Sequence, residues 1–239
     1  MALLLIPGFM LDRDIWGDVE DALEERYGPV FHVDLSIDGS IREMARRAVQ
    51  LVPEKFVVIG FSMGGYVARE IVRQIPDRVS ALVLIATSAR GGDMLQSKRV
   101  VSSAVERGAA SFRGISSSAV KTALHPKNHS RADLLARIQS MGERLGGEVF
   151  VRQSNLVRSD ERATLGDVRC PTLVIAGEHD MLRSNDEALE MVTGIASAEL
   201  VTVSGVGHMV PLEDPQQLTE VILAWLDEVS LVGLSPTQR

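Results

Sequence analysis

The chain has 239 residues, of which 45% are hydrophobic and 24% are charged, a composition typical of a globular protein large enough to bury a sizeable core. Its net charge of −7 argues against nucleic acid or an anionic membrane surface as a partner. The single cysteine, Cys170, excludes an intrachain disulfide, and the five histidines lack metal-ligand spacing.

The first apolar run, residues 2–6, stops at Pro7 and follows no basic segment. It therefore predicts a strand that enters a loop rather than a secretory signal peptide. No apolar run is long enough to span a membrane. We expect a cytoplasmic protein whose residues 1–239 form a single domain.

Short apolar runs then alternate with helical patterns along the chain. Most of the runs are apolar on successive residues, as in parallel strands that are covered on both faces. Helices are predicted over residues 41–52, after Ser62 as far as Ile75, and from Pro215, with Asp214 as the N-cap. The strands are predicted at residues 2–6, 30–34, 56–60, 81–86, 172–177 and 199–203. The alternation predicts an α/β fold with a mostly parallel central sheet flanked by helices.

Residues 88 to about 160 break this rhythm, because they show helical patterns and no convincing strand. We expect a helical cap over the carboxyl edge of the sheet, where ligands bind in such folds; the alternative is a set of packing helices without a functional role. The helical patterns cover residues 94–106, 118–123, 131–144 and 148–157. Seven arginines of this insertion either form ion pairs and a solvated face or include an anchor for an anionic group: Arg90, Arg99, Arg107, Arg113, Arg137, Arg144 and Arg152.

Ser62 lies in the stretch Gly60-Phe61-Ser62-Met63-Gly64, which matches the pattern G-x-S-x-G. In this motif the serine occupies a sharp turn from a strand into a helix, which exposes its Oγ above the sheet. Side chains at the two flanking glycine positions would collide across so tight a turn. The helix N-terminus directs free N–H groups at whatever the serine attacks. Ser62 is therefore the candidate nucleophile.

A serine hydroxyl needs a base within hydrogen-bond reach, and the base needs an orienting acid. His208, in a glycine-bracketed loop after the last predicted strand, is the candidate base, and Asp180, directly after the strand before it, is the candidate acid. All three side chains then meet at one edge of the sheet. Asp186 and Glu178 are the alternative acids, and Asp180 is alternatively a helix cap. The remaining histidines considered for the site are predicted to lie away from it: His125, His129 and His179.

Two backbone N–H groups are predicted to form an oxyanion hole. One belongs to Met63, which follows the nucleophile, and the other to Phe9, in the loop after the first strand. Gly8 allows this loop to approach the substrate closely, although an ordinary turn is the alternative. Five residues near the triad in sequence are candidates for the apolar lining of a substrate pocket, or else for ordinary core: Phe9, Met10, Trp16, Met63 and Met209.

Taken in chain order, these motifs resemble the α/β-hydrolase superfamily over essentially the whole sequence. The resemblance rests on PGFMLDRDIW, GFSMGGYVA, DRVSALVLIATSA, CPTLVIAGEHD and GVGHMVPLEDP. It implies a helical cap, Ser62 as nucleophile, Asp180 as acid and His208 as base, with Phe9 and Met63 as oxyanion donors. Pro7-Gly8 stands where many members carry His-Gly. The chain is most similar in these respects to small, esterase-like bacterial members.

The expected function is hydrolysis of a small-molecule carboxylic ester, lactone or thioester through an acyl-enzyme, with no metal or organic cofactor. Three alternatives stay open. The same triad is compatible with C–C bond hydrolysis, a lyase step or perhydrolysis, with a signalling receptor that turns over slowly, or with a catalytically inactive homologue. Aromatic residues make up only 4% of the chain, which argues against a carbohydrate-stacking cleft. No feature of the sequence predicts the oligomeric state.

Overall fold

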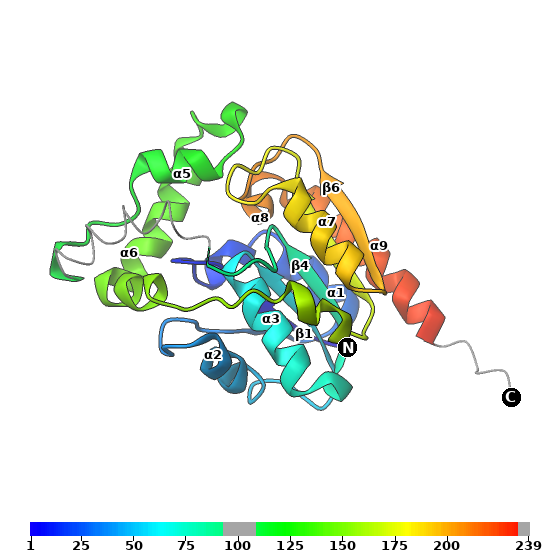
Figure 1. The fold of residues 1–239 in the computed structure, drawn as a ribbon. Helices are drawn as coiled ribbons and strands as arrows, with labels where there is room; N and C mark the ends of the chain where they lie inside the picture. Colours follow the sequence, from blue (N-terminus) through cyan, green and yellow to red (C-terminus); the bar gives the residue numbers. More distant parts are fainter. Residues whose placement is uncertain (93–108, 234–239) are drawn as a thin grey trace, which may run out of the picture.

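A computed structural model of the chain describes residues 1–92 and 109–233. Six parallel strands form one sheet in the order β2-β1-β3-β4-β5-β6 (Figure 1). Their bounds are β1 Ala2–Ile6, β2 Val30–His32, β3 Phe56–Phe61, β4 Val79–Ile85, β5 Thr172–Gly177 and β6 Ala198–Val203. The predicted fold class is thereby confirmed, and every predicted strand is present.

Helices cover both faces of the sheet, which explains why the central strands are apolar on successive residues. Leu3 and Leu5 of β1 pack in a cluster with residues of α1 (Glu20–Tyr27) and α9 (Pro215–Gly233). Leu4 and Ile6 point to the opposite face and pack with α2 (Ile41–Ala48), α3 (Met63–Gln74) and α7 (Asn185–Gly194). Because successive side chains of a strand alternate between faces, a sheet covered twice needs an uninterrupted apolar run.

The two edge strands depart from this pattern because each pairs with only one neighbour. β2 ends at His32, two residues before the predicted end, and its residues are only half-buried. β6 at the other edge is also largely half-buried. At the start of α9, Asp214 accepts a hydrogen bond from the Gln217 N–H at 2.9 Å, so the predicted N-cap is present.

In the described residues, the insertion after β4 consists of helices joined by loops, without a strand. It contains η3 (Ala109–Ser111), α5 (Ser117–Ala123), η4 (Pro126–Asn128) and α6 (Ala132–Ser154), and η5 (Arg162–Asp167) leads back to the sheet. The helix expected at 94–106 lies outside the described residues. The two helices expected at 131–144 and 148–157 are one element, α6, which is kinked at Gly146, where φ is 77°. Figure 1 shows α5 and α6 apart from the helices that flank the sheet.

Three shorter elements complete the fold: η1 (Arg13–Trp16), η2 (Pro76–Arg78) and α8 (Val210–Glu213). Both η1 and α8 follow loops that leave the carboxyl ends of strands, β1 and β6 respectively. In the part of the chain that the structure describes, no helix combines the length and the apolar character that crossing a membrane requires.

Candidate active site

Ser62 lies between the last residue of β3 and the first residue of α3, in a backbone conformation that L-residues rarely adopt (φ 51°, ψ −113°). Two hydrogen bonds hold it there. Its N–H donates to the Ile85 carbonyl at 2.8 Å, and its carbonyl accepts the Thr87 hydroxyl at 2.6 Å. The carboxyl end of β4 thus fixes the turn, and the Ser62 side chain projects from it.

The glycines on either side of Ser62 have no room for a side chain. A Cβ on Gly60 would lie 2.6 Å from the Gly64 carbonyl oxygen, and one on Gly64 would lie 2.4 Å from the Ile6 carbonyl oxygen. Both neighbours are backbone atoms, which cannot move aside as the end of a flexible side chain can. The collision predicted from the G-x-S-x-G spacing is therefore present at both positions.

The structure brings Ser62, His208 and Asp180 into one hydrogen-bonded chain. His208 Nε2 lies 2.9 Å from Ser62 Oγ, and His208 Nδ1 lies 2.8 Å from Asp180 Oδ2. An ionised carboxylate can only accept, so Nδ1 carries the proton and Nε2 is free to accept the serine hydroxyl. The side chains of His208 and Asp180 are 5% and 2% exposed, so little water competes for these bonds.

The loop after β5 orients Asp180. Its second oxygen, Oδ1, accepts the N–H groups of Leu182 and Arg183 at 2.7 and 2.9 Å. The alternative acids are placed differently: Glu178 accepts the Gly205 N–H at 2.8 Å, and Asp186 lies in the first turn of α7.

The other histidines of the insertion and the β5 loop do not reach Ser62. His125 and His179 contact each other, with ring centroids 4.4 Å apart. The ring of His129 lies against the Leu124 carbonyl, at 3.2 Å from Nε2. Among these four histidines, His208 alone lies within hydrogen-bond distance of the serine.

Glu213 of α8 joins the His208 loop to the insertion, a role that sequence reasoning did not find. One carboxylate oxygen accepts the Gly207 N–H at 2.8 Å. The other accepts the His125 N–H at 2.7 Å and the Asn128 side-chain amide at 2.8 Å. In addition, the N–H groups of His208 and Met209 both donate to the Ala123 carbonyl, at 2.9 and 3.2 Å. The candidate base is thus held by the end of α5.

The two candidate oxyanion donors are main-chain N–H groups of Met63 and Phe9. Met63 is the first residue of α3, and Phe9 lies in the loop after β1. Within residues 1–92 and 109–233, neither backbone N–H donates to a protein acceptor. The next residue, Met10, has a φ of 54° and donates its N–H to Gln153 Oε1 of α6 at 2.8 Å. The insertion therefore also holds the loop that carries Phe9.

The candidate pocket residues differ in their surroundings. Trp16 has no exposed surface and packs edge-on against Phe61, which favours ordinary core over a pocket wall. Met10 and Met209 are also buried, Met10 against Val149 and Phe150 of α6. The half-buried ring of Phe9 meets the ring of Phe150 at 5.8 Å.

Most of the insertion arginines are occupied by protein partners. Arg137 and Arg144 bind the acidic side chains of η1 and its flanks, and Arg90 pairs with Glu190 at 2.8 Å. Arg113 donates to carbonyls of its own loop, and Arg152 donates to the Ser36 carbonyl. Arg99 and Arg107 lie outside the described residues.

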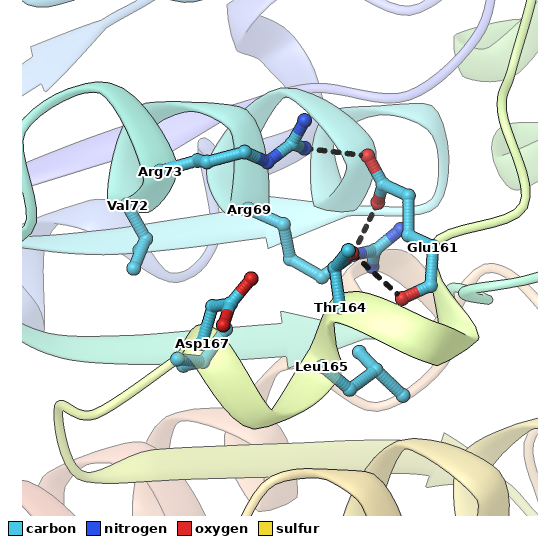
Figure 2. A pocket seen from close by; sticks show the side chains of 8 residues that line it. Arg69, Val72, Arg73, Glu161, Thr164, Leu165 and Asp167 are labelled. Carbon is cyan, nitrogen blue, oxygen red and sulfur yellow. Dashed lines mark hydrogen bonds and ion pairs between the residues drawn. The ribbon is translucent and has the colours of Figure 1, made fainter.

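A shallow pocket between α3 and η5 lies apart from the triad. Figure 2 shows that ion pairs occupy it: Glu161 accepts Arg69 Nε at 2.8 Å and an Arg73 guanidinium nitrogen at 2.7 Å. Both arginines of this pocket are therefore engaged by Glu161. The described part of the chain also gathers no three side chains of His, Cys, Asp or Glu that could hold a metal ion.

Residues 3–221 match the model of the alpha/beta hydrolase family. The chain therefore belongs to this family, as the motifs predicted. Membership supports hydrolase activity in general.

Solved structures from three bacteria share the fold. A thermophilic esterase from Thermogutta terrifontis is 24% identical, with 96% of this chain and 90% of that chain covered and a TM-score of 0.79. An enol-lactonase from Burkholderia xenovorans is 20% identical, with 95% and 91% covered and a TM-score of 0.82. A bromoperoxidase from Bacillus anthracis is 18% identical, with 95% and 91% covered and a TM-score of 0.79.

Proposed function

We propose that the protein is a serine hydrolase that cleaves a small-molecule carboxylic ester, lactone or thioester. The observation that carries the proposal is the continuous hydrogen-bonded chain from Ser62 Oγ through His208 to Asp180. The names of two similar structures, an esterase and an enol-lactonase, support the choice of a carbonyl ester bond.

In the proposed mechanism, Ser62 Oγ attacks the carbonyl carbon while His208 Nε2 takes the hydroxyl proton. Asp180 holds the imidazole in the required tautomer and stabilises the imidazolium. His208 then gives the proton to the leaving alcohol, an acyl-enzyme remains on Ser62, and His208 activates the water that releases the acid. These steps use only protein groups and water.

The negative oxygen of the tetrahedral intermediate binds the N–H groups of Phe9 and Met63 in this proposal. Both are backbone donors without a protein acceptor among the described residues, and Met63 opens α3, whose N-terminus favours negative charge. Loss of one such donor typically raises the barrier by about 2.7–4 kcal/mol. The insertion serves as a cap that shapes the substrate pocket.

The test is intact-mass measurement after reaction with a fluorophosphonate, which phosphonylates an activated serine with loss of fluoride. We expect one adduct on the wild type and none on Ser62→Ala. Asp180→Asn slows labelling strongly. The main-chain N–H groups of Leu182 and Arg183 retain the amide oxygen, so the NH₂ group faces His208 Nδ1 and favours the wrong imidazole tautomer. Asp186→Asn and Ser204→Ala label like the wild type. A folded wild type without an adduct contradicts the proposal and favours a receptor or an inactive homologue. Product analysis on an ester, lactone and C–C substrate panel then separates hydrolysis from the other reactions.

A further inference from the structure

Two arginines lie around the ring of Tyr66, a buried residue one helical turn after Ser62. The guanidinium carbon of Arg69 is 4.7 Å from the ring centroid and that of Arg158 is 5.6 Å from it. Arg69 is neutralised by Glu161, which accepts its Nε (Figure 2), and its guanidinium also donates to the Ser88 carbonyl. Among the described residues, no acid pairs with Arg158 in this way.

Arg158 lies in the segment that leads from α6 back to the sheet. Its Nε is buried and has no hydrogen-bond partner, and no carboxylate within residues 1–92 or 109–233 forms an ion pair with it. Burial lowers the pKa of Arg158, and the charge of Arg183 lowers it further. An arginine nonetheless keeps its charge in proteins, and a cation–π contact with Tyr66 compensates only part of the cost of burying it.

Arg183 is the second cation of this cluster and is also incompletely paired. Its Nε is buried without a partner, and its only ion pair in the described chain is with Glu187, at 3.4 Å. Arg183 therefore has one carboxylate partner in the described chain, and Arg158 has none. The cluster has one positive charge in excess, and its unpartnered N–H groups are suited to a planar oxyanion.

This cluster adjoins the catalytic machinery on two sides. Tyr66 belongs to α3, whose N-cap is Ser62, and the main-chain N–H of Arg183 donates to Asp180 Oδ1 at 2.9 Å. Because Arg183 is 20% exposed at its side chain, the cluster is partly accessible to a ligand.

We propose that Arg158 and Arg183 form a subsite that binds a carboxylate carried by the substrate, so that the enzyme prefers esters with an anionic group. The proposal rests on the hydrolase function proposed above and specifies its substrate class. Neither arginine takes part in bond cleavage. They hold one end of the substrate while Ser62 attacks the other.

The test compares pairs of esters of equal chain length that differ in charge. The 4-nitrophenyl half-esters of glutarate and adipate carry a carboxylate, while 4-nitrophenyl pentanoate and hexanoate do not. We expect kcat/KM of the wild type to be at least about tenfold higher for one charged ester than for its neutral partner, the effect of one charge-assisted hydrogen bond. Arg158→Gln removes this preference, Arg158→Lys restores part of it, and the control Arg131→Gln, which alters an exposed arginine paired with Asp133, retains it.

Equal kcat/KM for charged and neutral esters in the wild type overturns the proposal, as does an undiminished preference in Arg158→Gln. Inorganic phosphate distinguishes a substrate group from a free ion. If phosphate raises the melting temperature of the wild type but not of Arg158→Gln, and the esters show no preference, the cluster binds a free anion and the substrate assignment is wrong. Fluorophosphonate labelling of Ser62 is read independently, so failure of the subsite and failure of the hydrolase proposal are distinguishable.

Discussion

Gly64 lies against the carbonyl oxygens of Ile6 and Pro7, at 2.4 and 2.6 Å from the position of an added Cβ. The nucleophile turn and the loop that carries Phe9 are therefore in backbone contact. A methyl group at this position forces the two apart, which separates the serine from its candidate oxyanion donor.

We expect Gly64→Ala to lower the free energy of unfolding by about 1–3 kcal/mol, the usual cost of overpacking, and to lower kcat at temperatures where the protein is still folded. Urea unfolding and ester turnover measure the two effects. Gly39→Ala is the matched control, because a Cβ there meets no atom within 4 Å. Equal turnover in the two variants contradicts the expected separation.

At the scale of single residues, the sequence predicts site residues that belong to a local motif or directly follow the end of a strand. Ser62, Asp180 and His208 each follow the carboxyl end of a recognisable strand, so their meeting could be predicted. Glu213 and Arg158 could not be found in this way, because their partners lie on the insertion or across α3, far away in sequence. A buried side chain such as Trp16 is likewise indistinguishable from a pocket wall until packing is known.

The contact between α8 and the insertion is the element-scale feature on which the candidate base depends. Glu213 accepts three N–H donors with two oxygens. In Glu213→Gln an NH₂ group replaces one carboxylate oxygen. This NH₂ group faces an N–H donor, with which it cannot form a hydrogen bond. The loop of His208 and the end of α5 then lose their common acceptor.

We expect Glu213→Gln to reduce kcat/KM by ~10- to 100-fold, since small displacements of a catalytic group have effects of this size. Unsatisfied donors lower the free energy of unfolding by about 1–3 kcal/mol. Steady-state kinetics and urea unfolding test both effects. Glu220→Gln on the exposed side of α9 is the control, and its kinetics are expected to match the wild type. Wild-type kinetics in Glu213→Gln would show that α5 does not position the base.

At the scale of elements, periodicity predicts the type of an element better than its extent. The apolar pattern predicts a strand over residues 30–34, but β2 ends at His32, because the pattern does not show where pairing with β1 stops. The two helices expected on either side of Gly146 are one kinked helix. A glycine interrupts the helical pattern of the sequence both where a helix bends and where it ends, so the pattern does not distinguish the two. The order of the strands in the sheet follows from packing and was not predicted.

For the whole molecule, ion pairs attach the insertion to the body. Arg144 of α6 binds Asp12 at 2.8 Å and Asp14 at 3.1 Å, beside η1. Burial raises the pKa of Asp12, but hydrogen bonds from Arg144 and from the Asp14 N–H outweigh this effect and hold the pKa below its usual value. The folded state therefore binds this proton less readily than the unfolded chain does.

The contribution of Asp12 to stability is consequently complete above its unfolded pKa of about 4 and is lost as the pH falls through the lower, folded value. We expect the urea midpoint to decrease below pH ~4, and to decrease less in Arg144→Gln, which has already lost the pair. At pH 7 this variant is less stable by about 0.2–1 kcal/mol, as is usual for a pair with an exposed partner. Arg46→Gln, whose pair with Glu43 spans 4.0 Å within α2, is the control. A pH dependence in Arg144→Gln equal to that of the wild type contradicts this assignment.

The hydrogen bonds from His208 and Met209 to the Ala123 carbonyl bear on how this protein could be re-engineered. Exchanging the insertion for that of a relative is an obvious route to new specificity, but here the exchange would also remove the acceptor that holds the candidate general base. The new insertion must therefore supply a main-chain carbonyl at the same point. It must also supply N–H donors for Glu213, in place of the His125 N–H and the Asn128 amide. In the proposed hydrolase, specificity and catalytic competence therefore depend on the same insertion, and a library of insertions would have to be selected for both at once.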